Sequence, residues 1–143
     1  MTYTYRAAHT GEHDIIFDLY RLVMRDLITA IWGWNESWQA DDFAAYFNAK
    51  SITLVHHETT LVAYSQIENS PDRLFIRMIL VHPQHQGQGI GTQLLRTAIE
   101  LGETQTQRIG LEVFKINREA KLFYQRHGFK VEGETASSFV MAR

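Results

Sequence analysis

Three glycines stand at alternate positions within residues 82–95, which read HPQHQGQGIGTQLL. They are Gly87, Gly89 and Gly91, and they separate an apolar run from a run with helical spacing. Glycine lets backbone N–H groups converge without a Cβ in the way, and a helix N-terminus adds partial positive charge. A strand, a glycine-rich turn and a helix in this order favour binding of a phosphate or pyrophosphate. The alternative is a turn whose glycines serve only its own backbone geometry.

Two familiar phosphate-binding motifs fit this stretch poorly. A P-loop places a lysine before its serine or threonine, whereas Gly91 directly precedes Thr92 in this chain. A dinucleotide fingerprint needs its third glycine at position 92 and directly follows a first strand, but here residues 83–86 intervene in the middle of the chain. Neither class of nucleotide is therefore the expected ligand.

Cysteine and histidine offer little further chemistry. The chain has no cysteine, which excludes disulfides, thiolate metal ligands and a cysteine nucleophile. His56 and His57 are neighbours on an expected strand, so their side chains point to opposite faces. His82 and His85 flank Pro83 with no third ligand in view. We predict no metal site.

The composition predicts a soluble globular protein without nucleic-acid or membrane partners. The 143 residues fit a single domain spanning 1–143, and 45% hydrophobic residues can supply its core. A net charge of −2 without a basic block gives no footprint for a nucleic-acid backbone. No signal segment opens the sequence, and no apolar run approaches the roughly 20 residues that cross a bilayer. These features favour a cytoplasmic location.

Apolar periodicity predicts the elements that must position the glycine turn. The expected strands are residues 2–8, 51–57, 59–69, 73–83, 108–114, 130–134 and 137–143, and the expected helices are residues 12–30, 41–50, 89–102 and 117–128. Gly33 and Asn35 break the chain between the first two helices, and Gly102 is expected to stop the third. Asn117 is placed to cap the fourth helix, and Gly128 to end it. The order β-α-α-β-β-β-α-β-α-β-β indicates the α+β class.

Two separated stretches resemble the signatures of one superfamily. Gln86-x-x-Gly89-x-Gly91 matches a Q/R-x-x-G-x-G/A loop. The helix N-x-x-A-x-x-x-Y-x-x-x-G-F is matched by Asn117, Ala120, Tyr124, Gly128 and Phe129. Both stretches, and the order of elements, are similar to the GNAT superfamily of acetyl-CoA-dependent N-acetyltransferases. The resemblance covers nearly the whole chain and implies a central mixed, mostly antiparallel sheet with helices on both faces.

The resemblance implies acetyl-CoA as co-substrate, with no metal. The loop expected to hold its pyrophosphate through backbone amides consists of Gln86, Gly87, Gln88, Gly89, Ile90, Gly91 and Thr92. Many members carry arginine or lysine in this loop, whereas this chain has QGQG, so backbone amides and the helix dipole must contribute more of the binding. Arg96 and Lys121 are both candidates for the outer phosphate, and position alone does not choose between them.

The resemblance also gives backbone roles to the strand before the loop. Val81 would pair with the pantetheine arm, and the N–H of Ile79 would donate to the acetyl oxygen and stabilise a tetrahedral oxyanion. Both side chains can belong to the core as well, because the proposed roles use only the backbone. A bulge is expected to separate this strand from residues 110–115. Asn117 is expected mainly to cap its helix, and also to contact the arm.

Two residues are candidates for proton transfer. Tyr124 at the signature position would protonate the leaving thiolate, and the alternative is a core aromatic. An alkyl amine has a pKa of about 10, so a base must remove its proton before attack. Glu112, 12 residues before Tyr124, matches the base of members that act on protein N-termini, and its alternative is a solvated strand glutamate. Glu36 and Glu68 are lesser candidates. Direct transfer within a ternary complex is the expected route.

The stretch IWGWNESWQADDF, residues 31–43, is the expected acceptor side. Trp34 and Glu36 would suit a cationic amine, while a tryptophan-rich helix corner packed on the sheet is the alternative. Arg77 would bind an acceptor carboxylate or face solvent. The acceptor is a small-molecule amine or a peptide N-terminus, and the sequence does not separate them. A non-catalytic acyl-CoA sensing module on the same fold is the competing function, and a homodimer is compatible with the closing hairpin.

Overall fold

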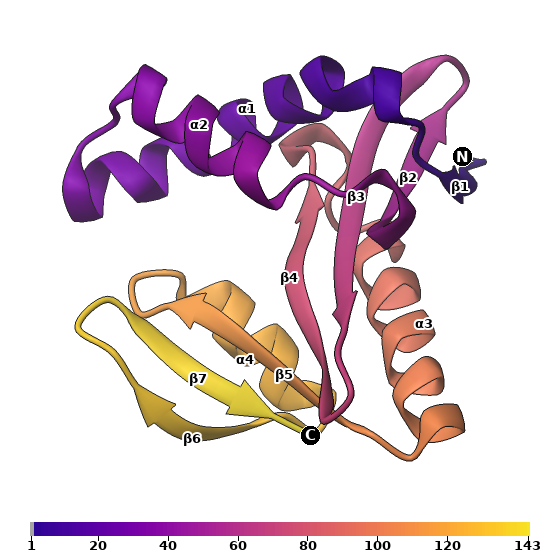
Figure 1. The fold of residues 1–143 in the computed structure, drawn as a ribbon, viewed down its shortest axis with the longest axis vertical. Helices are drawn as coiled ribbons and strands as arrows, with labels where there is room; N and C mark the ends of the chain where they lie inside the picture. The colour runs from indigo at the N-terminus through magenta and orange to yellow at the C-terminus, as the bar shows by residue number, and fades with distance from the viewer. Residues whose placement is uncertain (1) are drawn as a thin grey trace. The chain divides into compact units, whose positions relative to one another are not determined.

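The computed structural model describes residues 2–143 and shows a seven-stranded sheet in the order β1-β2-β3-β4-β5-β7-β6 (Figure 1). The strands are β1 (Thr4–Ala7), β2 (Ile52–His57), β3 (Thr60–Asn69), β4 (Arg73–Val81), β5 (Arg108–Phe114), β6 (Lys130–Glu134) and β7 (Ser138–Ala142). The α-helices are α1 (His13–Trp32), α2 (Glu36–Tyr46), α3 (Ile90–Gln105) and α4 (Arg118–Arg126). The pairs β1–β2, β2–β3, β5–β7 and β6–β7 are antiparallel, and β4–β5 is parallel. The predicted mixed, mostly antiparallel sheet and its element order are confirmed.

The chain forms two compact units. The first contains the residues up to Gln66 together with Met78–Leu95, and the second contains Ile67–Arg77 and Arg96–Arg143. Organisation as one domain stays a prediction. No helix in the described part of the chain is both long and apolar enough to span a membrane.

Helices cover both faces of the sheet in the first unit. Leu54 and Val55 are neighbours on β2, so their side chains point to opposite faces and enter different cores. The core on the Leu54 side is closed by α1, and its members include Ile16, Leu19, Ile52, Leu54 and Tyr64. The core on the Val55 side is closed by the first turns of α3, and its members are Val55, Val62, Ala63, Ile90 and Leu94. The start of α3 is therefore anchored by buried apolar side chains.

In the second unit, α4 lies against the β5–β7 pair. The Lys121 ammonium lies 4.3 Å from the centre of the Phe139 ring of β7. The ring of Tyr124 packs edge-on against those of Phe123 and Phe129, at 5.2 and 5.7 Å between centroids. Burial of Tyr124 fixes the rotation of α4 about its axis.

Single residues end the helices largely as predicted. Gly33 ends α1 with a φ of 80°, and Gly128 follows α4 with a φ of 89°. The Asn117 carboxamide oxygen accepts from the Ala120 N–H at 3.2 Å, which confirms the predicted cap. Left-handed backbone is nearly free of cost only for glycine, which explains why both stops were visible in the sequence.

Three predicted helix boundaries are wrong, and one of them is the end of the second helix, which lies at Tyr46 and not at Lys50. The second helix begins at Glu36 rather than Asp41, because the Asn35 side chain accepts from the Trp38 N–H at 2.8 Å and starts the helix earlier. The third helix passes Gly102 and ends at Gln105, before Thr106 with a φ of 54°. Gly102 instead leaves room for β5, since a Cβ there would lie 2.7 Å from Ile109 Cγ1.

Candidate functional site

The glycine turn leads directly into the N-terminus of α3. Gly87 and Gly89 have φ angles of 77° and 83°, and no atom lies within 4 Å of a Cβ built at either position. These glycines are therefore required by the backbone conformation and not by crowding. The Gly89 carbonyl accepts the first helical bond, from the Gln93 N–H at 3.0 Å. The N–H groups of the first helical turn have no carbonyl partner within the helix, so they can donate to a ligand.

Side-chain and backbone hydrogen bonds hold the approach to this turn. The Gln86 amide nitrogen donates to the Val81 carbonyl at 3.2 Å, so Gln86 folds back onto the end of β4. His82 Nδ1 accepts from the Gln84 N–H at 3.0 Å. His85 Nδ1 hydrogen-bonds the Tyr3 hydroxyl at 3.0 Å. The sequence did not reveal the contact with Tyr3, because 82 residues separate the partners and no local pattern links them.

The histidines near the turn do not form a recognisable metal centre. The rings of His57 and His85 lie 5.7 Å apart, and those of His82 and His85 lie 6.0 Å apart. Among the described residues no group of three or more histidine, cysteine, aspartate or glutamate side chains is arranged to hold a metal ion.

β4, the strand before the turn, carries half-buried side chains at its end, and its pairing with β5 stops before β5 itself ends. Ile79 and Val81 pack against the core closed by α3, so their side chains are occupied and only their backbone is available for a ligand. In the second unit, the parallel pairing of β4 with β5 runs from Arg73 opposite Arg108 to Ile76 opposite Leu111. β5 continues beyond this pairing to Phe114.

Tyr124 is buried, with 8% of its surface exposed. Burial raises the pKa of its phenol well above the ordinary value. The phenol therefore keeps its proton at neutral pH. No hydrogen bond of its hydroxyl to another side chain or backbone group is found within residues 2–143.

The two strand carboxylates considered as bases differ in their surroundings. Glu112 is exposed on β5 opposite Val140 of β7, and none of residues 2–143 forms an ion pair with it. Glu68 instead accepts from Arg77 in a two-pronged pair, at 2.5 Å from Nε and 3.1 Å from the terminal nitrogen. Arg77, predicted for the acceptor side, thus neutralises Glu68. Of the two carboxylates, Glu112 is the more exposed to solvent and the one without an ion pair to any of residues 2–143.

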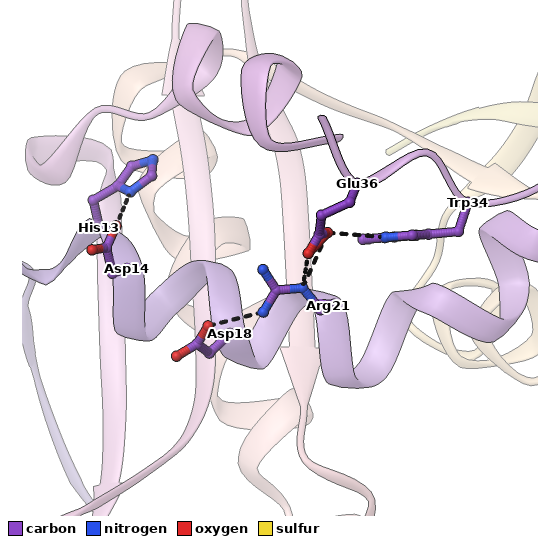
Figure 2. Close-up of polar contacts among 6 residues, drawn as sticks. All are labelled: His13, Asp14, Asp18, Arg21, Trp34 and Glu36. Carbon is purple, nitrogen blue, oxygen red and sulfur yellow. Dashed lines mark hydrogen bonds and ion pairs between the residues drawn. The ribbon is translucent and has the colours of Figure 1, made fainter. Parts of the chain in front are cut away.

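Trp34 and Glu36 are brought together at the junction of α1 and α2 (Figure 2). The Trp34 indole N–H donates to Glu36 Oε2 at 3.0 Å, and Arg21 Nε donates to Glu36 Oε1 at 2.5 Å. A terminal nitrogen of Arg21 also donates to Asp18 at 3.0 Å, and the Arg25 guanidinium lies 5.6 Å from the Trp34 ring centre. Sequence reasoning missed Arg21, because it lies 15 residues from Glu36 on another helix.

The Acetyltransferase (GNAT) family model matches residues 16–129. The chain belongs to this family. The match includes the glycine turn and the whole second signature, so the resemblance seen in the two signatures is confirmed.

One relative of this chain is named as a polyamine acetyltransferase. The spermine/spermidine N(1)-acetyltransferase of Bacillus subtilis strain 168 is 33% identical to this chain over 69 residues. That match covers 47% of this chain and 45% of the relative, so it spans less than half of the relative's own length.

Two solved N-acetyltransferase structures share the fold over nearly the whole chain. The PaiA N-acetyltransferase from Thermoplasma acidophilum, in complex with coenzyme A, has a TM-score of 0.82 at 16% identity, covering 100% of this chain and 99% of that one. The ribosomal-protein-S18-alanine N-acetyltransferase from Escherichia coli has a TM-score of 0.76 at 19% identity, covering 99% of this chain and 92% of that one. At these identities the likeness establishes the fold.

Proposed function

We propose that this GNAT protein transfers the acetyl group of acetyl-CoA directly to a primary amine. The observation that carries the proposal is the left-handed turn at Gly87 and Gly89, which leads into the N-terminus of α3. Such a turn presents backbone N–H groups and partial positive charge to an anion. The pyrophosphate of coenzyme A would bind there through residues 86–92, without a lysine or arginine from the loop.

The proposed chemistry exchanges a C–S bond for a C–N bond. A base removes a proton from the ammonium, the free amine attacks the thioester carbonyl, and the tetrahedral oxyanion accepts a hydrogen bond from the Ile79 N–H. Collapse of the intermediate expels the thiolate, which takes a proton from the Tyr124 phenol. Val81 and Asn117 would contact the pantetheine arm. The nitrogen is cationic after its attack and loses a second proton as the intermediate collapses, and this proton restores the phenol, so the step balances.

The proposed acceptor is a small polyamine, and a peptide N-terminus is the competing acceptor. The Bacillus relative is named for spermine and spermidine, and the Escherichia coli structure for an alanine of ribosomal protein S18. Trp34 and Glu36 supply an aromatic face and a carboxylate that is 53% exposed, features that suit an alkyl ammonium. Arg21 already pairs with this carboxylate, so a cationic acceptor would have to share it.

An amine panel tests the proposed function. We expect acetyl-CoA to release free thiol only when an amine is added, with spermidine turning over faster than a peptide with a free N-terminal alanine. The free thiol is measured with a chromogenic thiol reagent, and the acetylated product is identified by its mass in mass spectrometry. Saturable acetyl-CoA binding without thiol release across polyamines, amino acids and peptides would instead establish a sensing module.

Replacing Glu112 with glutamine is expected to change the acidic limb of the pH–rate profile. An amide cannot take up the proton of the amine as a carboxylate can, so the glutamine variant is expected to lack the acidic limb. We expect kcat to fall by about 10²-fold at neutral pH. Glu132 to glutamine on β6 is the control, because that exposed carboxylate pairs with Arg108 on the surface. An acidic limb that survives in the Glu112 variant would remove Glu112 from the role.

A further inference from the structure

A hollow of about 500 Å³ lies in the second unit, between the later turns of α3, the end of α4 and Arg143. We call it the arginine hollow. The charged and titratable side chains that line it are Arg96, Glu100, Glu103, Arg126, His127 and Arg143. It shares no residue with the glycine turn or with the predicted catalytic residues. Of its charged residues, only Arg96 has a role in the functions considered above, as a candidate for the outer phosphate of coenzyme A.

The charges of the arginine hollow are predominantly positive. Its three arginines outnumber its two glutamates, so these five side chains carry a net charge of +1. Arg143 pairs with Glu103 at 3.3 Å. Arg96 and Arg126 form no ion pair or hydrogen bond with any of residues 2–143. Two guanidinium groups, which carry only donors, are therefore available to a ligand.

His127 has a fixed tautomer that leaves one ring nitrogen available. Its Nδ1 lies 2.8 Å from the Phe123 carbonyl oxygen. A carbonyl only accepts, so Nδ1 must carry the hydrogen, and Nε2 is left without that constraint.

Gly128 and the last strand position Arg143 at this hollow. Arg143 continues the β5 pairing, since its N–H donates to the Ile109 carbonyl at 2.9 Å and its carbonyl accepts from the Ile109 N–H at 3.2 Å. Its side chain then passes over Gly128, with Nε only 3.0 Å from the place where a Cβ would stand. A larger residue at position 128 would displace the guanidinium. Gly128 of the second signature thus leaves room for the Arg143 side chain.

Helix-end electrostatics explains only part of this arrangement. Arg126 and His127 stand at the C-terminus of α4, where positive charge stabilises the helix dipole. Arg96 belongs to the middle of α3 and Arg143 to the end of the chain that pairs with β5, so the dipole of α4 does not account for them. We propose that the arginine hollow binds a small oxyanion, a phosphate or carboxylate group of a soluble metabolite. Guanidinium forks match both groups with paired hydrogen bonds.

Calorimetric titration of the full chain with inorganic phosphate and, separately, with succinate tests this site. Sodium chloride at matched ionic strength gives the baseline. We expect saturable binding of at least one of the two anions, weakened about tenfold by Arg126→Ala and by Arg143→Ala. Lys130→Ala, which removes an exposed positive charge from β6, should leave the affinity unchanged. The anion that binds more tightly identifies the group that the hollow prefers.

Further variants keep the test decisive. Arg126→Lys retains the charge without the fork and should lose part of the affinity, which covers the case that the alanine variant does not fold. Gly89→Val alters the other expected anion site, and binding at the arginine hollow should survive it. Absence of saturable binding for both anions would overturn the proposal. So would an equal loss of affinity in the Lys130 and Arg126 variants, because it would indicate unspecific attraction.

Discussion

Replacing Tyr124 with phenylalanine is expected to lower kcat for acetyl transfer by about 10²-fold and to leave the KM for acetyl-CoA nearly unchanged. The phenol would act only when the C–S bond breaks, so its loss affects the transition state and not the binding of the ground state. The substitution removes one oxygen and keeps the ring. Contacts with Phe123 and Phe129 should persist. Steady-state kinetics with saturating amine measures both parameters.

The pH profile sharpens this expectation. Burial raises the pKa of the Tyr124 phenol, so the acid form that the mechanism needs persists as pH rises past the ordinary tyrosine value of about 10. Activity lost through this group would therefore decline only above that value. An alkaline limb that begins well below pH 10 must belong to another group, and it should remain in the phenylalanine variant.

A change of leaving group separates catalysis from packing. An acetyl thioester of an acidic aromatic thiol needs no proton when the thiolate departs, so the Phe variant should lose less of its rate with that substrate. The thermal midpoint of the variant reports whether the helix still packs. Unchanged turnover with acetyl-CoA and an unchanged midpoint would remove Tyr124 from the mechanism and leave it as a core aromatic.

Short-range signals explain the parts of the fold and site that the sequence predicted. A glycine stop or an asparagine cap depends on a few neighbouring backbone groups. The helix ends at Gly33 and Gly128 and the cap at Asn117 could therefore be predicted from the sequence. The turn at Gly87 and Gly89 is equally local, because its φ angles restrict the residue type wherever the turn occurs.

Long-range partners could not be read in this way. Glu36 is bound by Arg21 from another helix, and Glu68 by Arg77 from the neighbouring strand, so both charges are partly neutralised by residues that no spacing rule connects. Gly102 was expected to stop a helix, but it leaves room for Ile109 of β5. A glycine required by tertiary packing looks the same in the sequence as one required by φ. Only the fold distinguishes the two.

Replacing Gly89 with valine is expected to raise the KM for acetyl-CoA between about 5-fold and 150-fold, with a much smaller effect on kcat. The φ of 83° is strained for any residue with a Cβ, and most of all for a branched one. Such strain costs about 1–3 kcal/mol, which corresponds to that range. The space around the position is open, so the variant can fold by moving the turn. The moved turn would no longer present its N–H groups to the pyrophosphate.

Two controls decide whether backbone conformation is the cause. Gly11→Val places the same side chain in equally open space on a glycine without positive φ, and it should leave the KM unchanged. Gln88→Ala removes the exposed side chain between the two left-handed glycines and should also do little, because the expected contacts come from main-chain N–H groups. If Gln88→Ala raised the KM more than Gly89→Val, the side chain would be the binding group. The absence of arginine and lysine from the loop would then be compensated by glutamine and not by the backbone.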